Sequence, residues 1–313
     1  MDGFKTRGVN FMSKLVELFS KEEYILKGNA SCPGCGAALL LRYVLKALGK
    51  KTILVIPACC TSVIAGPYPK TCFNIPVMHI AFAASAATAS GIAEALEIVN
   101  KKDVNVVVWA GDGGTVDIGL QGLSGAAERG HNMFYICYDN EAYMNTGIQR
   151  SGSTPIGAWT TTTPGGNTTP KKDLPSIMIA HRIPYIATGS PAYPQDLVMK
   201  IRKAKKIEGF KYIHLHSPCP LGWRFDASKT IEVARLAVLT GVWVLYEVEN
   251  GVFRLTGPSR KLIDKSKRKP VREYLKLQGR FRHMFKPGNE WMIEKFQEWV
   301  DKQWEMLLKK AGY

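Results

Sequence analysis

The amino-acid sequence predicts an α/β protein built around a doubly wound, mostly parallel β-sheet. Its candidate strands are continuous apolar runs rather than runs that alternate with polar residues, which is typical of a sheet covered on both faces. These runs also alternate with helical patterns along the chain. The chain has 313 residues, of which 46% are hydrophobic, so it is long enough to bury a sizeable core.

The predicted elements follow one another in a regular order. After a Gly-rich loop at 31–36 and a helical pattern that begins at Leu39, strands are expected at 52–58, 104–110, 133–138, 184–189, 211–217 and 241–248. The helices between them are expected at 82–99, 117–129, 195–207 and 229–239. A long loop rich in Thr, Pro and Gly is expected at 144–173, and such loops are often functional.

Charge divides the chain into two expected parts, an α/β domain at 1–250 and a basic, mostly helical extension at 251–313. The net charge is +16, and the extension alone holds 16 Lys and Arg against 7 Asp and Glu. A basic surface favours an acidic partner, and a solvated or heat-adapted surface is the alternative. The chain has no aromatic-interleaved basic motif, so nucleic acid is the weaker choice of partner.

Nothing in the sequence predicts a membrane span or an export signal. The least polar stretch, 80–99, contains Glu94 and Glu97 and is interpreted as a buried helix. The first residues, MDGFKTRGVNFMSK, lack the apolar core of a signal peptide. The seven cysteines are an odd number, which fits reduced thiols in a cytoplasmic protein better than disulfides.

The segment GDGG, 111–114, follows the apolar run 104–110, at the strand end where ligands of parallel sheets bind. Its three glycines, Gly111, Gly113 and Gly114, let the backbone approach a phosphate closely. Asp112 would repel a phosphate unless a divalent cation lies between them, and Mg²⁺ prefers oxygen ligands. The alternative is a simple strand–helix turn in which Asp112 caps the helix.

Asn140 offers a second oxygen ligand at the end of the next strand. It follows Asp112 by 28 residues, across one helix and one strand. This is one βαβ step, so the two loops are expected to be neighbours.

Cys32 and Cys35 form a C-x-x-C motif, which by itself fits zinc, a redox dithiol or an iron–sulfur cluster. Further cysteines follow two strand ends, in PACCTS (57–62) and HSPCP (216–220). Because strand ends converge on one edge of a parallel sheet, these cysteines can meet the first pair. Cys72 and Cys137 have no partner pattern.

Five segments carry a resemblance to a known family: CPGCG, GDGGTVDIGLQGLSGAAERG, YDNEAYMNTGIQRSGSTPIGAWTTTTP, HSPCPLGW and KPVREYLKLQGRFRH. They resemble, in order and over nearly the whole chain, the thiamine-diphosphate-binding beta subunit of pyruvate and other 2-oxoacid:ferredoxin oxidoreductases. GDG followed by Asn at the next strand end also resembles the general thiamine-diphosphate motif. The resemblance implies the thiamine-diphosphate-binding fold.

The resemblance implies a cofactor site. Asp112, Asn140 and the main-chain carbonyl of Ala142 would hold Mg²⁺, and Asn145 would contact the substrate or an intermediate, with a loop-stabilising role as its alternative. The residues implied to surround the cofactor are Gly111, Asp112, Gly113, Gly114, Asn140, Ala142, Tyr143 and His79, of which His79 fits a core or capping role equally well.

The resemblance also implies a [4Fe–4S] cluster held by Cys32, Cys35, Cys60 and Cys219. Cys59 competes with Cys60 because one residue of misalignment exchanges them. Family enzymes oxidatively decarboxylate pyruvate to acetyl-coenzyme A and CO₂ and pass electrons through the cluster to ferredoxin, whereas a sister enzyme converts oxalate to CO₂ without coenzyme A. Ala83-Ala84 replace the usual Glu-Asn pair of the family, which leaves both substrates open.

The family forms multi-subunit enzymes, and the glutamate that activates the cofactor comes from another subunit. We therefore expect this chain to bind cofactor and cluster but to be inactive alone. Two other classes compete with this interpretation. A non-catalytic zinc-binding module would explain C-x-x-C but not GDGG with Asn140, and an acetolactate synthase-like decarboxylase is a much longer chain with its own glutamate.

Overall fold

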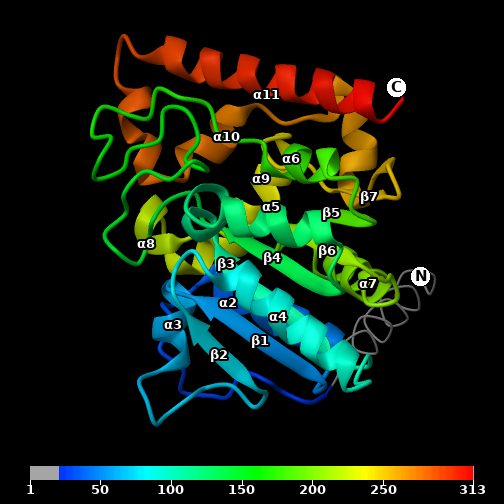
Figure 1. The fold of residues 1–313 in the computed structure, drawn as a ribbon. Coiled ribbons are helices and arrows are strands. Elements are labelled where there is room, and N and C mark those ends of the chain that lie inside the picture. The colour runs from blue at the N-terminus through cyan, green and yellow to red at the C-terminus, as the bar shows by residue number, and fades with distance from the viewer. Residues whose placement is uncertain (1–20, 313) are drawn as a thin grey trace, which may run out of the picture.

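The computed structural model describes residues 21–312 of the chain. The N-terminal segment that bears on the expected lack of an export signal lies outside the described residues. Figure 1 shows one sheet with helices on both faces. The strands of this sheet are β1 (Thr52–Pro57), β2 (Val77–Ile80), β3 (Asn105–Gly111), β4 (Met133–Asp139), β5 (Tyr185–Gly189), β6 (Phe210–His216), β7 (Tyr246–Glu249) and β8 (Val252–Leu255).

The helices fill the intervals that the sequence predicts and add several short ones. Their bounds are α2 (Gly36–Leu48), α3 (Cys60–Ala65), α4 (Ser85–Ile98), α5 (Leu120–Arg129), α6 (Leu174–Ala180), α7 (Pro194–Ala204), α8 (Pro220–Trp223), α9 (Thr230–Leu239), α10 (Val271–Lys276) and α11 (Glu290–Lys310). Local signals set several ends: Asp173 caps α6 by accepting from Ser176 N, and Gly130 ends α5 with a left-handed φ of 68°.

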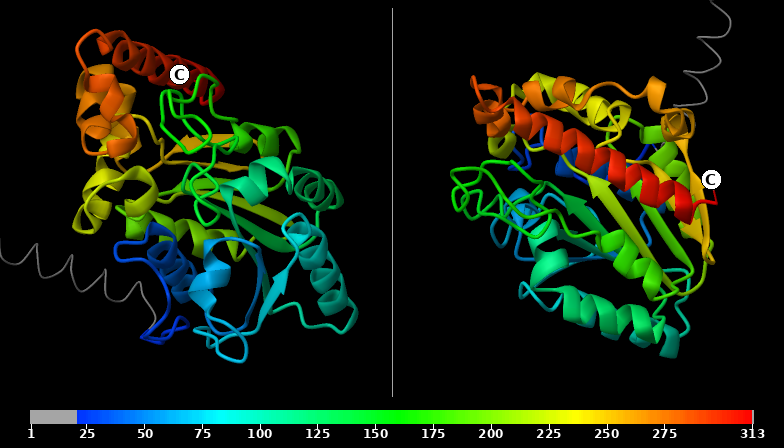
Figure 2. Two further views of the ribbon diagram at one scale, coloured as in Figure 1. Left: turned by 90° about the vertical axis from the view of Figure 1, so that its left-hand side faces the viewer. Right: turned by 90° about the horizontal axis from the view of Figure 1, so that it is seen from above.

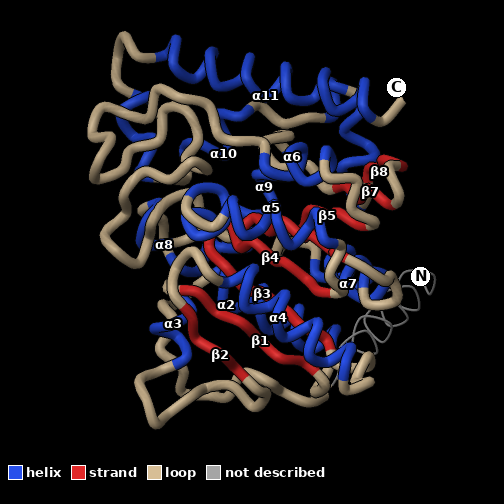
Figure 3. The backbone as a smooth tube through the Cα atoms, viewed as in Figure 1, coloured by secondary structure: helices blue, strands red, loops and turns tan. Residues whose placement is uncertain are grey.

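The strand order is β2-β1-β3-β4-β6-β5-β7-β8, and the first six strands are parallel. Alternate residues of one strand enter different cores: Val106, Val108 and Ala110 of β3 pack on one face, and Val107 and Trp109 on the other. Burial on both faces is why these strands are uninterrupted apolar runs. The predicted doubly wound α/β class is confirmed, and Figure 3 shows its strands side by side between helices.

The predicted strand 241–248 differs from the structure. The strand found there, β7, spans only Tyr246–Glu249 and pairs antiparallel with β5. The preceding residues are buried but make no ladder: Thr188 Oγ1 donates to the Val244 carbonyl, and Leu245 N donates to Ser259 Oγ. Side chains thus form hydrogen bonds with part of the backbone in a segment whose apolar sequence is typical of a strand.

The extension is not purely helical, because it begins with β8, which pairs with β7 at the sheet edge. The expected boundary after residue 250 therefore falls inside a hairpin. Beyond β8 the chain forms 3₁₀ turns and the helices α10 and α11. The long helix α11 lies across one end of the molecule, red in Figures 1 and 2, and buries Phe296, Val300 and Trp304 in the core.

Candidate active site

The GDGG segment forms the predicted turn at the carboxyl end of β3. Gly111 is the last residue of the strand, and its register partner on β4 is Tyr138, so Asp112 and Asn140 do follow neighbouring strands. After Asp112 the chain makes a π turn, Gly113–Asp117, before α5 begins. Such turns interrupt helices mostly at functional sites.

Neighbouring rings explain why residues 113 and 114 are glycines. A Cβ on Gly113 would lie 2.6 Å from Tyr143 Cδ1, and a Cβ on Gly114 would lie 2.9 Å from Phe82 Cε2. Without side chains here, the backbone faces a cavity directly. The residues that line this cavity are Ala58, Cys59, Cys60, Phe82, Gly111, Asp112, Gly113, Gly114, Tyr138, Asn140, Ala142, Tyr143, Met144, Asn145 and Thr146.

Three oxygen atoms converge at the edge of this cavity. The Asn140 amide oxygen lies 2.9 Å from Asp112 Oδ1 and 2.9 Å from the Ala142 carbonyl oxygen, and it meets no donor in this orientation. Rotating the amide would let its nitrogen donate to both oxygens. A cation would satisfy the three oxygens as they stand, because neighbouring ligands of octahedral Mg²⁺, each about 2.1 Å from the ion, lie roughly 3 Å apart.

The electrostatics of Asp112 favour a cation. Its side chain is 1% exposed, and burial, followed by the nearby Asp139, raises its pKa well above the usual value. Ser151 Oγ donates to its other oxygen, Oδ2. Among the ion pairs of residues 21–312, none includes Asp112, and the nearby Lys171 offsets the rise of its pKa only in part.

The loop after Asn140 borders the same cavity. Tyr143 donates from its hydroxyl to Asp117 Oδ2 at 2.9 Å, which ties the loop to the π turn. Asn145 is exposed and lines the cavity, where a substrate could reach it. His79 lies within β2, is exposed, and is not among the lining residues.

The predicted cysteines gather beside this cavity. Gly36 N donates to the Pro218 carbonyl at 3.2 Å, and Thr230 Oγ1 donates to the Gly34 carbonyl at 2.7 Å, so the C-x-x-C loop docks next to Cys219. Burial, and then Cys35 and Cys32, raise the pKa of Cys219 to about 11, although the Gly222 N–H lowers it. Burial also raises the pKa of Cys35, as does the nearby Cys32.

Cys60 and Cys59 face different neighbours. Burial raises the pKa of Cys60, and Cys219, Cys59 and Cys35 raise it further, so this thiol belongs to the cysteine group. Cys59 instead caps α3 and interacts with the Tyr138 hydroxyl. In residues 21–312, no three Cys, His, Asp or Glu side chains are arranged to hold one metal ion.

A buried charge network that the sequence did not reveal lies behind the loop at 140–142. Asp139 Oδ2 meets Lys171 Nζ at 2.6 Å and His214 Nε2 at 2.7 Å. Glu141 Oε2 meets Arg280 Nη2 at 2.6 Å. These partners come from distant parts of the chain, and no spacing in the sequence links them.

The residues that line the cavity lie within a segment that matches a known protein family. Residues 58–215 match the family described as "Thiamine pyrophosphate enzyme, C-terminal TPP binding domain".

Within the described part of the chain, no helix is both long enough and apolar enough to span a membrane.

Two kinds of curated relative are similar over nearly the whole chain. Ketoisovalerate oxidoreductase subunit VorB of Pyrococcus abyssi is 54% identical over 300 residues, covering 93% of this chain and 94% of the relative. Pyruvate synthase subunit PorB of Methanothermobacter marburgensis is 55% identical over 286 residues, covering 90% and 96%. Among solved structures, the 2-oxoglutarate:ferredoxin oxidoreductase from Magnetococcus marinus matches with a TM-score of 0.55 at 26% identity, covering 69% of this chain and 82% of that one.

Proposed function

The chain belongs to the thiamine-diphosphate-binding beta subunits of 2-oxoacid:ferredoxin oxidoreductases, and from this premise we propose that it holds thiamine diphosphate–Mg²⁺ and a [4Fe–4S] cluster for the oxidative decarboxylation of pyruvate. The observation that carries the proposal is the convergence of the Asp112 carboxylate, the Asn140 side-chain amide and the Ala142 carbonyl beside a glycine-lined cavity. It is an oxidoreductase subunit that acts on 2-oxo acids.

The charge of the site supports the Mg²⁺ assignment. Asp139 and Glu141 each form ion pairs with cationic side chains, whereas Asp112 forms none among residues 21–312. Mg²⁺ bound by Asp112 Oδ1, the Asn140 amide oxygen and the Ala142 carbonyl would compensate this charge and keep further positions for diphosphate oxygens and water. The backbone at Gly113 and Gly114 would lie against the diphosphate, because both glycines line the cavity and carry no side chain that would keep a ligand away.

The proximity of Cys32, Cys35, Cys60 and Cys219 supports the cluster: these thiols raise one another's pKa values, and small side-chain rotations would be needed to bring them around one metal site. Backbone N–H groups point at two of the sulfurs: Ala38 N lies 3.5 Å from Cys35 Sγ, and Gly222 N lies 3.4 Å from Cys219 Sγ. Such N–H···S bonds stabilise thiolates and help to set the reduction potential of an iron–sulfur cluster. The pKa values raised by burial would be lowered by iron, because a coordinating thiol is deprotonated.

Bound thiamine diphosphate supplies the electron sink for decarboxylation of a 2-oxo acid. This chain contributes binding and placement: Asp112 and Asn140 orient the cofactor through the metal, and Asn145 reaches the substrate side of the cavity. Cys60 lines the same cavity, so cofactor and cluster would be neighbours, as electron transfer requires.

Among residues 21–312, Asp112 is the sole carboxylate that lines the cavity, and it is proposed to bind the metal rather than to activate the cofactor. A glutamate from another subunit is therefore proposed to complete the site, and the isolated chain is proposed to be inactive. Ferredoxin is the proposed electron acceptor, with coenzyme A as acetyl acceptor.

The relatives favour a second candidate substrate, because VorB and PorB proteins match this chain about equally well. We therefore place 2-oxoisovalerate beside pyruvate as a substrate. Oxalate is a third candidate, and it would need no coenzyme A.

Ferredoxin reduction by the complex purified through a tag on this chain tests the proposal. Pyruvate, 2-oxoisovalerate, 2-oxoglutarate and oxalate should each be supplied with and without coenzyme A. We expect pyruvate-dependent reduction that requires coenzyme A, with iron and acid-labile sulfide in the complex. Stoichiometric zinc without sulfide would instead support a non-catalytic zinc-binding module, and turnover by the chain alone would contradict the need for a second subunit.

A further inference from the structure

We infer that Arg280, in the C-terminal extension, is a positioning residue for the metal-binding loop and acts through Glu141 and Trp223. The inference rests on the proposed function, because the loop at 140–142 supplies two of the three proposed Mg²⁺ ligands. It gives the extension a role in the site that its basic composition did not suggest.

Glu141 sits between two ligand residues in a conformation that must be held. Its φ is 67°, in the left-handed region that non-glycine residues rarely adopt and that costs energy for an L side chain. Its N–H donates to Asp139 Oδ1 at 3.0 Å, and its carbonyl accepts from Thr154 Oγ1 at 2.7 Å. This turn brings the Ala142 carbonyl back beside the Asn140 amide.

The Glu141 carboxylate is held by two cations, of which Arg280 is buried and Lys171 is 14% exposed. Oε2 meets Arg280 Nη2 at 2.6 Å and Oε1 meets Lys171 Nζ at 3.1 Å, and the Arg280 and Glu141 side chains are only 2% and 4% exposed. Each carboxylate oxygen of Glu141 therefore has its own cationic partner, and the side chain cannot move without breaking at least one of these ion pairs.

Arg280 also reaches Asn140 through Trp223. The guanidinium carbon lies 3.8 Å from the centroid of the Trp223 ring, and Trp223 Nε1 donates to the Asn140 carbonyl at 2.7 Å. One guanidinium group thus contacts Glu141 directly and supports Asn140 through the Trp223 ring. Trp223 ends the short helix α8 that Cys219 caps, so the same contact ties the metal-binding loop to a proposed cluster ligand.

Hydrogen bonds within the extension and to Trp159 hold Arg280 in position. Its Nε donates to Gln278 Oε1 at 2.9 Å, and Gln278 Nε2 donates to the Tyr274 carbonyl at 2.9 Å. The Arg280 carbonyl accepts from Trp159 N at 2.9 Å. The arginine therefore reaches Glu141 from a fixed backbone position.

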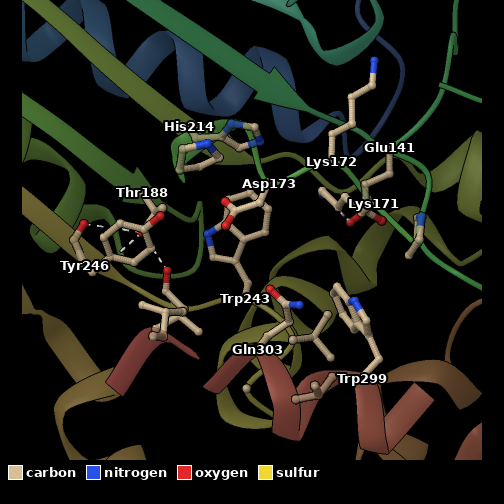
Figure 4. Close-up of a pocket in the computed structure, with 17 residues that line it drawn as sticks. Glu141, Lys171, Lys172, Asp173, Thr188, His214, Trp243, Tyr246, Trp299 and Gln303 are labelled. Carbon is tan, nitrogen blue, oxygen red and sulfur yellow. Dashed lines mark hydrogen bonds and ion pairs between the residues drawn. The ribbon is translucent and has the colours of Figure 1, made fainter. Parts of the chain in front are cut away.

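Packing alone does not fix Glu141, because a cavity of about 120 Å³ adjoins it. Figure 4 shows Glu141 and Lys171 beside each other at this cavity, to the right of Trp243 and His214. Without Arg280, the Glu141 side chain has space to move into, and the left-handed turn loses its strongest restraint. The proposed consequence is a misplaced Ala142 carbonyl and weaker Mg²⁺ binding.

The test compares Arg280→Gln and Glu141→Gln with Arg268→Gln in the purified complex. Arg268 is a matched control: it also lies in the extension, is 7% exposed, and stacks on a tryptophan, Trp304, at 4.1 Å. Mg²⁺ affinity is measured by calorimetry at saturating thiamine diphosphate. We expect about 10- to 100-fold weaker Mg²⁺ binding in the first two variants, as is usual when a group supporting a metal ligand is lost.

Further readouts separate a local role from general loss of stability. The Glu141→Gln and Arg280→Gln double variant should bind Mg²⁺ no more weakly than the worse single variant, and Arg280→Lys should recover part of the affinity. Hydrogen exchange without cofactor should show faster exchange at 141–146 in Arg280→Gln but not in Arg268→Gln. Wild-type affinity in Arg280→Gln, or an equal loss in Arg268→Gln, would overturn the inference.

Hydrogen exchange also separates this inference from the proposed function. If the wild-type complex bound no Mg²⁺ but exchange at 141–146 still rose in Arg280→Gln alone, the proposed function would fail and the positioning role would stand. If Mg²⁺ bound to the wild type and neither readout changed in Arg280→Gln, the positioning role would fail alone.

Discussion

Replacing Gly113 with alanine should weaken both the fold and the cofactor site. The new Cβ would lie 2.6 Å from Tyr143 Cδ1, 2.9 Å from Cζ and closer still to Cε1, whereas ordinary contacts are 3.4–4 Å. The ring must retreat by roughly 1 Å, because the glycine backbone is fixed at the strand end. That movement also stretches the 2.9 Å hydrogen bond from the Tyr143 hydroxyl to Asp117.

The two effects give the expected magnitude. Overpacking costs about 1–3 kcal/mol, and a hydrogen bond to a charged group contributes about 1.5–3 kcal/mol. Because Tyr143 is partly exposed and can swing toward solvent, we expect the lower part of the combined range, about 2.5–3.5 kcal/mol. Thiamine diphosphate affinity should fall as well, since Tyr143 lines the cavity.

Urea unfolding of the full chain measures the first effect, and calorimetric titration of the complex measures the second. Gly91→Ala in α4 is the control, because a Cβ there meets nothing within 4 Å and should add about 0.5–1 kcal/mol of helix stability. Free energies of unfolding for Gly113→Ala and wild type that agree within about 0.5 kcal/mol, with unchanged cofactor affinity, would refute the steric reasoning.

Three further predictions follow from charges and thiols. Burial and Asp139 raise the pKa of Asp112, so its ionised form destabilises the metal-free chain above pH ~4. Unfolding in EDTA should therefore show that Asp112→Asn is more stable than wild type at pH 7 and equally stable in stronger acid. Unfolding with Mg²⁺ and thiamine diphosphate should show that the variant has lost the stabilisation that these ligands give to the wild type. Cys60→Ser should lose most iron while Cys59→Ser retains it, and equal iron contents would reject Cys60 as the ligand. Lys171→Met should cost about 3–5 kcal/mol at pH 7. Burial would raise the pKa of Asp139, yet Lys171 and His214 lower it, so this stabilisation exists above pH ~4 and disappears as pH falls through the lower folded value; an equal loss at pH 3 and pH 7 would contradict it.

The sequence could predict those parts of the fold that depend on one βαβ step. GDGG and Asn140 end consecutive strands, and the structure pairs those strands directly. The approach of Cys219 to the C-x-x-C loop could be predicted for a different reason, because Cys219 follows a strand end and strand ends converge on one edge of a parallel sheet. The doubly wound class followed from strands that are apolar on both faces.

Other features have no local signature. The apolar run at 241–248 is as hydrophobic as a strand, but Thr188 and Ser259 satisfy part of its backbone, and only Tyr246–Glu249 joins the sheet. Glu141 and Arg280 lie 139 residues apart in the sequence. Nothing in the sequence around either residue indicates that the two form a buried ion pair. Whether His79 contacts a cofactor stays a prediction, and its exposed position in β2 does not favour it.

Thiamine diphosphate binding to the complex, compared between wild type and Asp112→Asn, tests the central assignment most directly. Calorimetric titration with Mg²⁺ and with EDTA separates binding through the metal from binding by the protein alone. Tight binding only for the wild type in the presence of Mg²⁺ is the predicted result. Equally tight, Mg²⁺-dependent binding by Asp112→Asn would contradict the placement of the metal between this carboxylate and the diphosphate.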